Sequence, residues 1–331
     1  MDSNKPRTKG ELQSQFLKEL YQIIEMEGFQ KQIPIIIVEG EFDNDLFSKI
    51  RIPGQVNIVS VKTALDATIG EVKGEKTTKK EKNKLSNKDQ VRHAASNLIE
   101  LGYIAIGIQD SDLDGIKNIF SRGEFKSPSH SKAIIQTYPS RDMETMLYSV
   151  LQKKGAFSSF PKELEQCISK AMNLAYLGIA INQFNKKSKL DKNFGLSGFC
   201  WDMKSKKMKL YSQICNSLDK LLSEYKNSEM KNLEPNLLDL LETEVNNVVE
   251  KINQLKLNWS EFVRGHDLET FVIHYNEDSL NSLKKYYKEM LDNLNKKLLR
   301  RVLGYHFINH HPMFVNLEQW RHEKQLPELF D

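Results

Sequence analysis

Three acidic residues follow two short apolar runs and could together hold divalent cations. Glu39 comes directly after the run 35–38, and Asp110 and Asp112 follow the run 103–108. Short apolar runs of this kind are typical of buried strands. If the two strands are parallel, their carboxyl ends meet at one edge of a sheet, which is where α/β proteins bind ligands. Three carboxylates at that edge favour Mg²⁺ or Mn²⁺ over zinc.

Clustered carboxylates raise one another's pKa, and bound cations offset that cost. Two divalent ions can bind a phosphodiester, activate a water molecule and stabilise the leaving oxygen. The alternative is that Asp110 and Asp112 only form the turn after a strand, as aspartates often do. The strand that ends at Glu39 is what favours the metal site over this alternative.

The elements around these residues alternate between strand and helix patterns. Segment 31–155 is therefore expected to be an α/β domain with a mainly parallel sheet and helices on both faces. A helix within segment 1–30, at about 11–27, should precede it. The expected strands are 34–39, 56–61, 103–108 and 133–137, and the expected helices are 43–50, 63–72 and 88–101.

Strand patterns nearly vanish in segment 156–331, which is expected to be an α-helical domain. Apolar residues recur there at helical spacing. The expected helices are 161–177, 210–225, 235–255 and 280–303. The lysine-rich segment 185–209 contains two glycines and is expected to be a loop or an irregular insertion.

A third motif, 141–144 with the sequence Arg-Asp-Met-Glu, opens a helix after the fourth expected strand. A strand ending in Val-Glu-Gly, a strand ending in Asp-x-Asp and this motif together resemble the TOPRIM domain of topoisomerases, bacterial primases and overcoming-lysogenization-defect nucleases. The order of the motifs is most similar to the TOPRIM nucleases of bacterial anti-phage defence, such as the nuclease subunits of PARIS abortive-infection systems. The resemblance covers roughly residues 33–150.

The resemblance implies a Mg²⁺- or Mn²⁺-dependent endonuclease. Glu39, Asp110 and Asp112 would bind the metal, Asp142 and Glu144 would complete its shell, and Glu39 and Glu144 would also take part in catalysis. For Asp142 and Glu144 the alternative is a favourable interaction with the dipole of the helix that they open.

The same resemblance implies a toxic effector of anti-phage defence that cleaves RNA such as tRNA. A partner ATPase of the ABC or AAA type would control it. Two other readings stay open: a TOPRIM nuclease that nicks or cleaves DNA, and a module that binds nucleic acid or another protein without catalysis.

Two further residues could assist catalysis. Lys62 follows the second expected strand, where its ammonium could neutralise a scissile phosphate, although a surface lysine is the alternative. His266 lies in a Gly-His-Asp-Leu string that resembles one in the helical part of the same nucleases. Its imidazole could move protons near neutral pH, and the alternative is a segment that only caps a helix.

A basic segment between positions 73 and 92 could meet the phosphates of a nucleic acid. It contains eight lysines and arginines against three acidic residues. The segment is expected to be a partly disordered arm that contacts phosphates, with a solvated loop as the alternative. The residues expected to bind nucleic acid are Lys79, Lys80, Lys82 and Lys84.

Composition favours a cytoplasmic protein without a membrane partner. Charged residues make up 28% of the 331 residues, and the formal net charge is +4. No apolar run approaches the ~20 residues of a membrane-spanning helix, and the first residues do not resemble a secretory signal. The three cysteines form no Cys-x-x-Cys motif, which argues against a zinc ribbon. A homodimer stays open.

Overall fold

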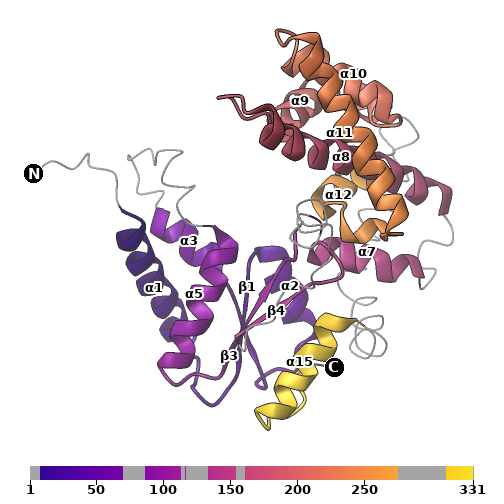
Figure 1. The fold of residues 1–331 in the computed structure, drawn as a ribbon. Helices are drawn as coiled ribbons and strands as arrows, with labels where there is room; N and C mark the ends of the chain where they lie inside the picture. Colours follow the sequence, from indigo (N-terminus) through magenta and orange to yellow (C-terminus); the bar gives the residue numbers. More distant parts are fainter. Residues whose placement is uncertain are drawn as a thin grey trace, which may run out of the picture. The chain divides into compact units, whose positions relative to one another are not determined.

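The computed structural model describes residues 8–69, 86–112, 116, 133–153, 161–274 and 311–330. The chain forms two compact units. Unit 1 comprises Met1–Tyr138 and Asp292–Asp331, and unit 2 comprises Pro139–Leu291. Figure 1 labels their helices and strands.

Unit 1 is built on a four-stranded sheet in the order β2-β1-β3-β4, and all of its neighbouring strands are parallel. Because Ile37 lies opposite both Val59 and Gly107, the strands end at one common edge. The expected mainly parallel sheet is therefore confirmed. The strands are β1 (Ile35–Val38), β2 (Asn57–Ser60), β3 (Ala105–Gln109) and β4 (Ile134–Gln136).

Three helices cover one face of this sheet: α1 (Lys9–Met26), α3 (Val61–Ile69) and α5 (Asn87–Glu100). Their apolar residues form one buried cluster with side chains from every strand. Gly107 of β3 allows α5 to approach closely, because a Cβ atom there would lie 2.6 Å from Val91 of α5.

The other face is covered by α2 (Glu41–Ile50) and α15 (Pro312–Glu323) (Figure 1). The ring of Phe47 in α2 lies 6.1 Å from the ring of Phe314 in α15 and 5.8 Å from that of Phe330. Helices on both faces, as the sequence predicted, are therefore confirmed.

The expected boundary between residues 155 and 156 differs from the division seen in the structure. The segment from Pro139 onward belongs to unit 2, whereas α15 belongs to unit 1. The reason is physical: aromatic residues of α15 and Phe330 complete the core on the α2 face, and the backbone N–H of Ile52 donates to the carbonyl of Leu329 at 2.8 Å.

The regular elements among the described residues of unit 2 are all helices, as expected for this part of the chain. Phe271 stacks on Tyr211, and Tyr176 stacks on Phe262, in its core. Its helices are α7 (Met143–Lys153), α8 (Pro161–Ser188), α9 (Leu196–Ile214), α10 (Leu218–Glu229), α11 (Pro235–Gln254), the 3₁₀ helix η1 (Trp259–Glu261) and α12 (Gly265–His274).

The prediction of a loop at 185–209 was wrong, because α8 runs to Ser188 and α9 begins at Leu196. Gly195 caps the start of α9. Phe199 packs edge-on against Tyr225 of α10 with 5.4 Å between ring centroids, a long-range contact that the local sequence does not indicate. The helix expected at 280–303 lies outside the described residues.

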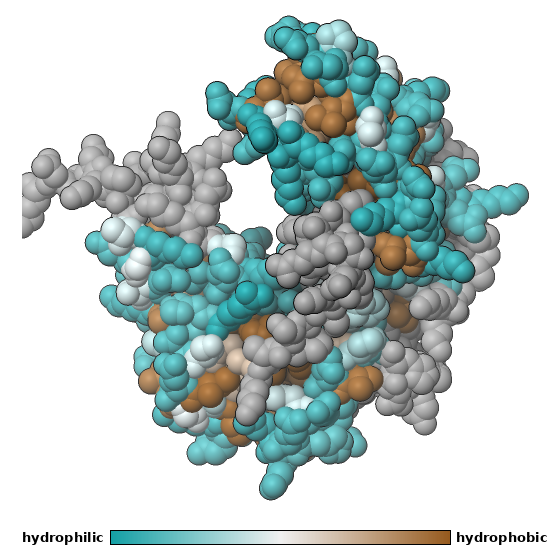
Figure 2. All heavy atoms as spheres, viewed as in Figure 1, coloured by the Kyte–Doolittle hydropathy of each residue, from teal (hydrophilic) through white to brown (hydrophobic). Residues whose placement is uncertain are grey.

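Hydrophilic residues cover most of the visible face of both units (Figure 2). In the part of the chain that the structure describes, no helix is both long enough and apolar enough to cross a membrane.

Candidate metal centre

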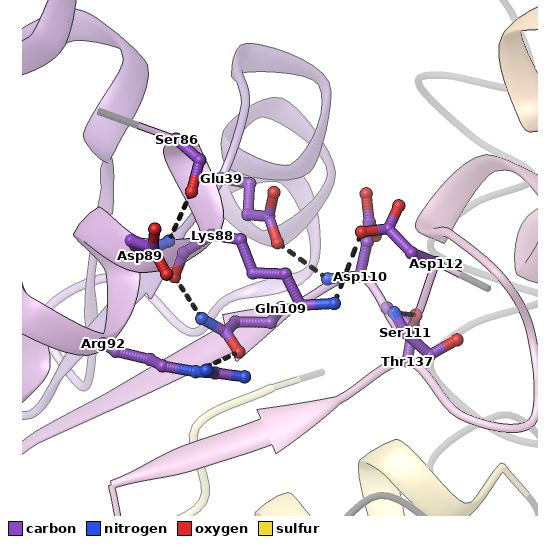
Figure 3. Close-up of polar contacts among 10 residues, drawn as sticks. All are labelled: Glu39, Ser86, Lys88, Asp89, Arg92, Gln109, Asp110, Ser111, Asp112 and Thr137. Atoms are coloured by element: carbon purple, nitrogen blue, oxygen red, sulfur yellow. Dashed lines mark hydrogen bonds and ion pairs between the residues drawn. The ribbon is translucent and has the colours of Figure 1, made fainter. Parts of the chain in front are cut away.

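Two of the predicted ligands meet at the carboxyl edge of the sheet. Glu39 directly follows β1, and Asp110 directly follows the neighbouring strand β3. The backbone N–H of Asp110 donates a hydrogen bond of 3.0 Å to Oε1 of Glu39 (Figure 3). Asp112, the third predicted ligand, lies two residues further along the same loop.

The loop after β3 is held by its neighbours. The N–H of Ser111 donates to Oγ1 of Thr137, at the end of β4, over 3.0 Å. The backbone of Asp112 has φ = 51°, in the left-handed region that aspartate enters more readily than most residues. On the β1 side, the N–H of Gly40 donates to Oδ2 of Asp43, which fixes the start of α2.

The sequence analysis missed a cation at this edge. Lys88, the second residue of α5, places its Nζ atom 3.3 Å from Oδ2 of Asp112 (Figure 3). It had been counted with the basic segment, but the helix already begins at Asn87, where Ser86 accepts a hydrogen bond from the N–H of Asp89. The sequence analysis already placed Lys88 at the start of an expected helix, 88–101, but no local pattern indicated that its side chain reaches Asp112.

The surroundings of Glu39 strongly perturb the pKa of its carboxyl group. Burial raises the pKa of Glu39 from 4.5 to about 7. The Asp110 N–H and the positive charge of Lys88 act to lower this pKa, whereas the negative charges of Asp112 and Asp43 raise it further. A carboxylate in this position is stabilised by any additional proton or cation.

The donors at this edge suit a hard divalent cation, since all of them are carboxylate oxygens. The Lys88 ammonium already lies against one of them, so the edge attracts a cation. Within the described ranges, however, no three His, Cys, Asp or Glu side chains are grouped so that they could share one metal ion. The carboxylate oxygens match the chemistry that Mg²⁺ and Mn²⁺ prefer, and one of the three expected ligands, Asp112, is paired with Lys88.

Lys62 lies near the end of β2, and its side chain is exposed. Its N–H donates to Oγ of Ser60 over 3.1 Å, at the start of α3. The contact of Lys62 with a scissile phosphate stays a prediction. Lys79, Lys80, Lys82 and Lys84 lie outside the described residues, so their predicted role is likewise untested.

Asp142 has a structural role in unit 2 at the start of α7, as in the alternative given above, and it also contacts the start of α12, which the sequence analysis did not foresee. Its Oδ1 accepts from the N–H of Thr145 at 2.9 Å, the contact of a cap at the start of α7. Its Oδ2 accepts from the N–H of Gly265, the first residue of α12, also at 2.9 Å. Burial raises the pKa of Asp142, and these hydrogen bonds act to lower it.

Glu144 lies in α7 and His266 lies in α12, the two helices whose starts Asp142 contacts. A Cβ atom at Gly265 would collide with Cβ of Glu144, so glycine is what lets the start of α12 approach α7. His266 is exposed, and the buried Asp267 beside it lies 3.9 Å from Nζ of Lys204. Because Asp142, Glu144 and His266 belong to unit 2, their roles at a site in unit 1 stay predictions.

Comparison with known proteins finds no match among protein-family models, curated proteins or solved structures.

Proposed function

We propose that the chain is a metal-dependent phosphodiesterase, a TOPRIM-type endonuclease whose centre is formed by Glu39, Asp110 and Asp112. The observation that carries the proposal is the placement of Glu39 and Asp110 at the ends of two adjacent parallel strands, joined by a 3.0 Å hydrogen bond. Ligand sites of parallel α/β sheets lie at this edge.

Mg²⁺ or Mn²⁺ would supply charge neutralisation and an activated water molecule when bound. Glu39, Asp110 and Asp112 would hold the ion through their carboxylate oxygens. Glu39 is also suited to proton transfer, because its pKa of about 7 lies near physiological pH. Lys62 would contact a phosphate from the end of β2.

The proposed substrate is RNA, with tRNA favoured, and the proposed setting is anti-phage defence under a partner ATPase. This part of the proposal rests on the motif resemblance given above. A nuclease that acts on its own cell's RNA needs restraint, which is consistent with a controlling partner. DNA as the substrate remains the alternative within the same reaction class.

A second candidate is a nucleic-acid-binding module without catalysis. Two observations favour it: Lys88 already pairs with Asp112, and no three potential ligands in the described ranges are grouped around one point. We call the carboxyl edge of the sheet with Glu39, Asp110 and Asp112 the acidic edge. In such a module Lys88 would neutralise part of its negative charge, and the acidic edge would need no metal.

Cleavage assays separate these candidates. Purified chain would be incubated with total tRNA and with supercoiled plasmid in Mg²⁺, in Mn²⁺ and in EDTA. Glu39→Gln removes the central carboxylate, and Glu25→Gln, on the exposed side of α1, is the matched control. We expect metal-dependent cleavage of tRNA that is lost in Glu39→Gln alone. Binding of tRNA without cleavage by any variant, also with a co-purified ATPase present, would favour the module.

A further inference from the structure

Lys88 occupies a position that is locally unfavourable for a lysine. It is the second residue of α5, and a positive charge in the first turn of a helix opposes the helix dipole. Natural sequences break such local rules mainly where function requires it. The compensation comes from the acidic edge, because Nζ of Lys88 pairs with Asp112 at 3.3 Å and lowers the pKa of the nearby Glu39.

The start of α5 is fixed to the ends of β1 and β3 by side-chain hydrogen bonds. Nδ2 of Asn87 donates to the carbonyl of Glu39 over 3.3 Å. The side-chain amide of Gln109 donates to the carbonyl of Lys88 and accepts from Nε of Arg92 at 3.1 Å (Figure 3). These contacts fix the backbone of Lys88 beside the acidic edge, within reach of its ammonium group.

Lys88 and Asp112 differ in how far their side chains are exposed to solvent. The side chain of Lys88 is 17% exposed, whereas that of Asp112 is 53% exposed. An ion pair with one partner this exposed is weak, so a divalent cation could replace the ammonium at little cost. Lys88 would keep its anchored backbone after that exchange, and only the end of its flexible side chain would need to move.

We propose that Lys88 is the resident cation of the acidic edge. In the metal-free protein its ammonium neutralises Asp112, and metal binding displaces it so that it contacts the phosphate of the substrate. The inference rests on the proposed function, and it deepens that function by assigning Lys88 two successive partners. Lysine suits this role because its ammonium acts as a point charge on a long flexible stem.

Lys88→Met keeps the length of the side chain and removes its charge. If Lys88 pairs first with Asp112 and then with the phosphate, this variant should bind the metal more tightly and the nucleic acid more weakly. Mn²⁺ should bind about fivefold more tightly, because no ion pair has to be broken first. The KM for the nucleic acid should rise about tenfold, because a phosphate contact is lost. A purely structural role would move neither value in this pattern.

The test measures Mn²⁺ affinity by electron paramagnetic resonance, and then KM and kcat, for the wild type, Lys88→Met and Lys88→Arg. Lys62→Met is the control for a general loss of positive charge at the same edge and is compared for Mn²⁺ affinity alone, because Lys62 is itself proposed to contact a phosphate. Tighter Mn²⁺ binding in Lys88→Met, with little change in Lys62→Met and Lys88→Arg, supports the inference. Equal Mn²⁺ affinity in the wild type and Lys88→Met, or equal tightening in Lys62→Met, overturns it.

Failure of the proposed function would look different. A wild type that binds no Mn²⁺ and cleaves no nucleic acid refutes the metal centre itself, and the Lys88 inference with it. A wild type that binds Mn²⁺ and cleaves, but whose KM is unchanged in Lys88→Met, refutes only the phosphate contact of Lys88.

Discussion

Replacing Glu39 by Gln should stabilise the metal-free protein at alkaline pH. Glutamine has almost the same shape as a protonated Glu39, and its side-chain oxygen can still accept from the N–H of Asp110. The substitution removes only the negative charge that burial and the neighbouring Asp112 and Asp43 disfavour. Above pH 7 the folded wild type holds this unfavourable negative charge on Glu39, whereas the variant has no charge at this position.

The magnitude follows from the pKa shift. The pKa of Glu39 rises from 4.5 to about 7 on folding. Between these values the folded state binds more protons than the unfolded state, so stability falls as pH rises through this window and then levels off. A shift of this size corresponds to about 3 kcal/mol, so Glu39→Gln should be more stable than the wild type by about that amount at pH 8.5 and equally stable below about pH 4.

Urea unfolding in EDTA measures this difference. Trp320, buried in α15, reports on unit 1, and a background with Trp201→Phe and Trp259→Phe removes the tryptophans of unit 2. Glu25→Gln, at an exposed position of α1, should change the free energy of unfolding by less than about 0.5 kcal/mol at every pH. A Glu39→Gln variant that is no more stable than the wild type at pH 8.5 would refute the account of Glu39.

Three further predictions concern the contacts that build the two units. Asp142→Ala should lower the stability of unit 2 by about 2–4 kcal/mol, seen in Trp259 fluorescence, because two helix starts lose a buried acceptor. Gly107→Ala should cost unit 1 about 1–3 kcal/mol in the Trp320 assay, because its Cβ atom would lie 2.6 Å from two neighbouring side chains. Ser86→Ala should cost about 1 kcal/mol in the same assay, because α5 loses its cap.

Matched variants check the reasons given for Asp142 and Gly107. Asp142→Asn keeps an acceptor oxygen and should recover part of the loss seen in Asp142→Ala. Gly10→Ala, in a helix position with no neighbour within 4 Å of the new Cβ atom, should be harmless. Losses as large in Asp142→Asn and Gly10→Ala as in the test variants would show that the named contacts are not responsible.

The sequence predicted the parallel sheet and the positions of Glu39 and Asp110 at its edge, but not the order of the strands. Strands such as Ile35–Val38 are short, apolar and entirely buried, so composition alone locates them. Parallel pairing then brings Glu39 and Asp110 together, because strand ends in a parallel sheet share one edge. This part of the site depended only on local patterns and one topological rule.

Long-range packing decided what the sequence could not predict. Nothing local indicates that α15 completes the core of unit 1 beside Phe47, or that the lysine-rich segment before Tyr211 is helical. The role of Lys88 depends on the fixed start of α5, and the role of Asp142 depends on a helix that begins 123 residues away in the sequence. The local sequence around residues such as Lys88 and Asp142 looks the same whether the side chain belongs to a binding site or only stabilises the start of a helix.

The central claim is that the acidic edge binds a metal ion that contacts the scissile phosphate. The most direct measurement compares cleavage of a normal RNA transcript with cleavage of the same transcript made with phosphorothioate linkages. Sulfur binds Mg²⁺ poorly and tolerates the softer Mn²⁺ better, so we predict at least about tenfold slower cleavage in Mg²⁺ and recovery in Mn²⁺. Equal rates for both transcripts in Mg²⁺, or cleavage that persists in EDTA, would contradict the claim.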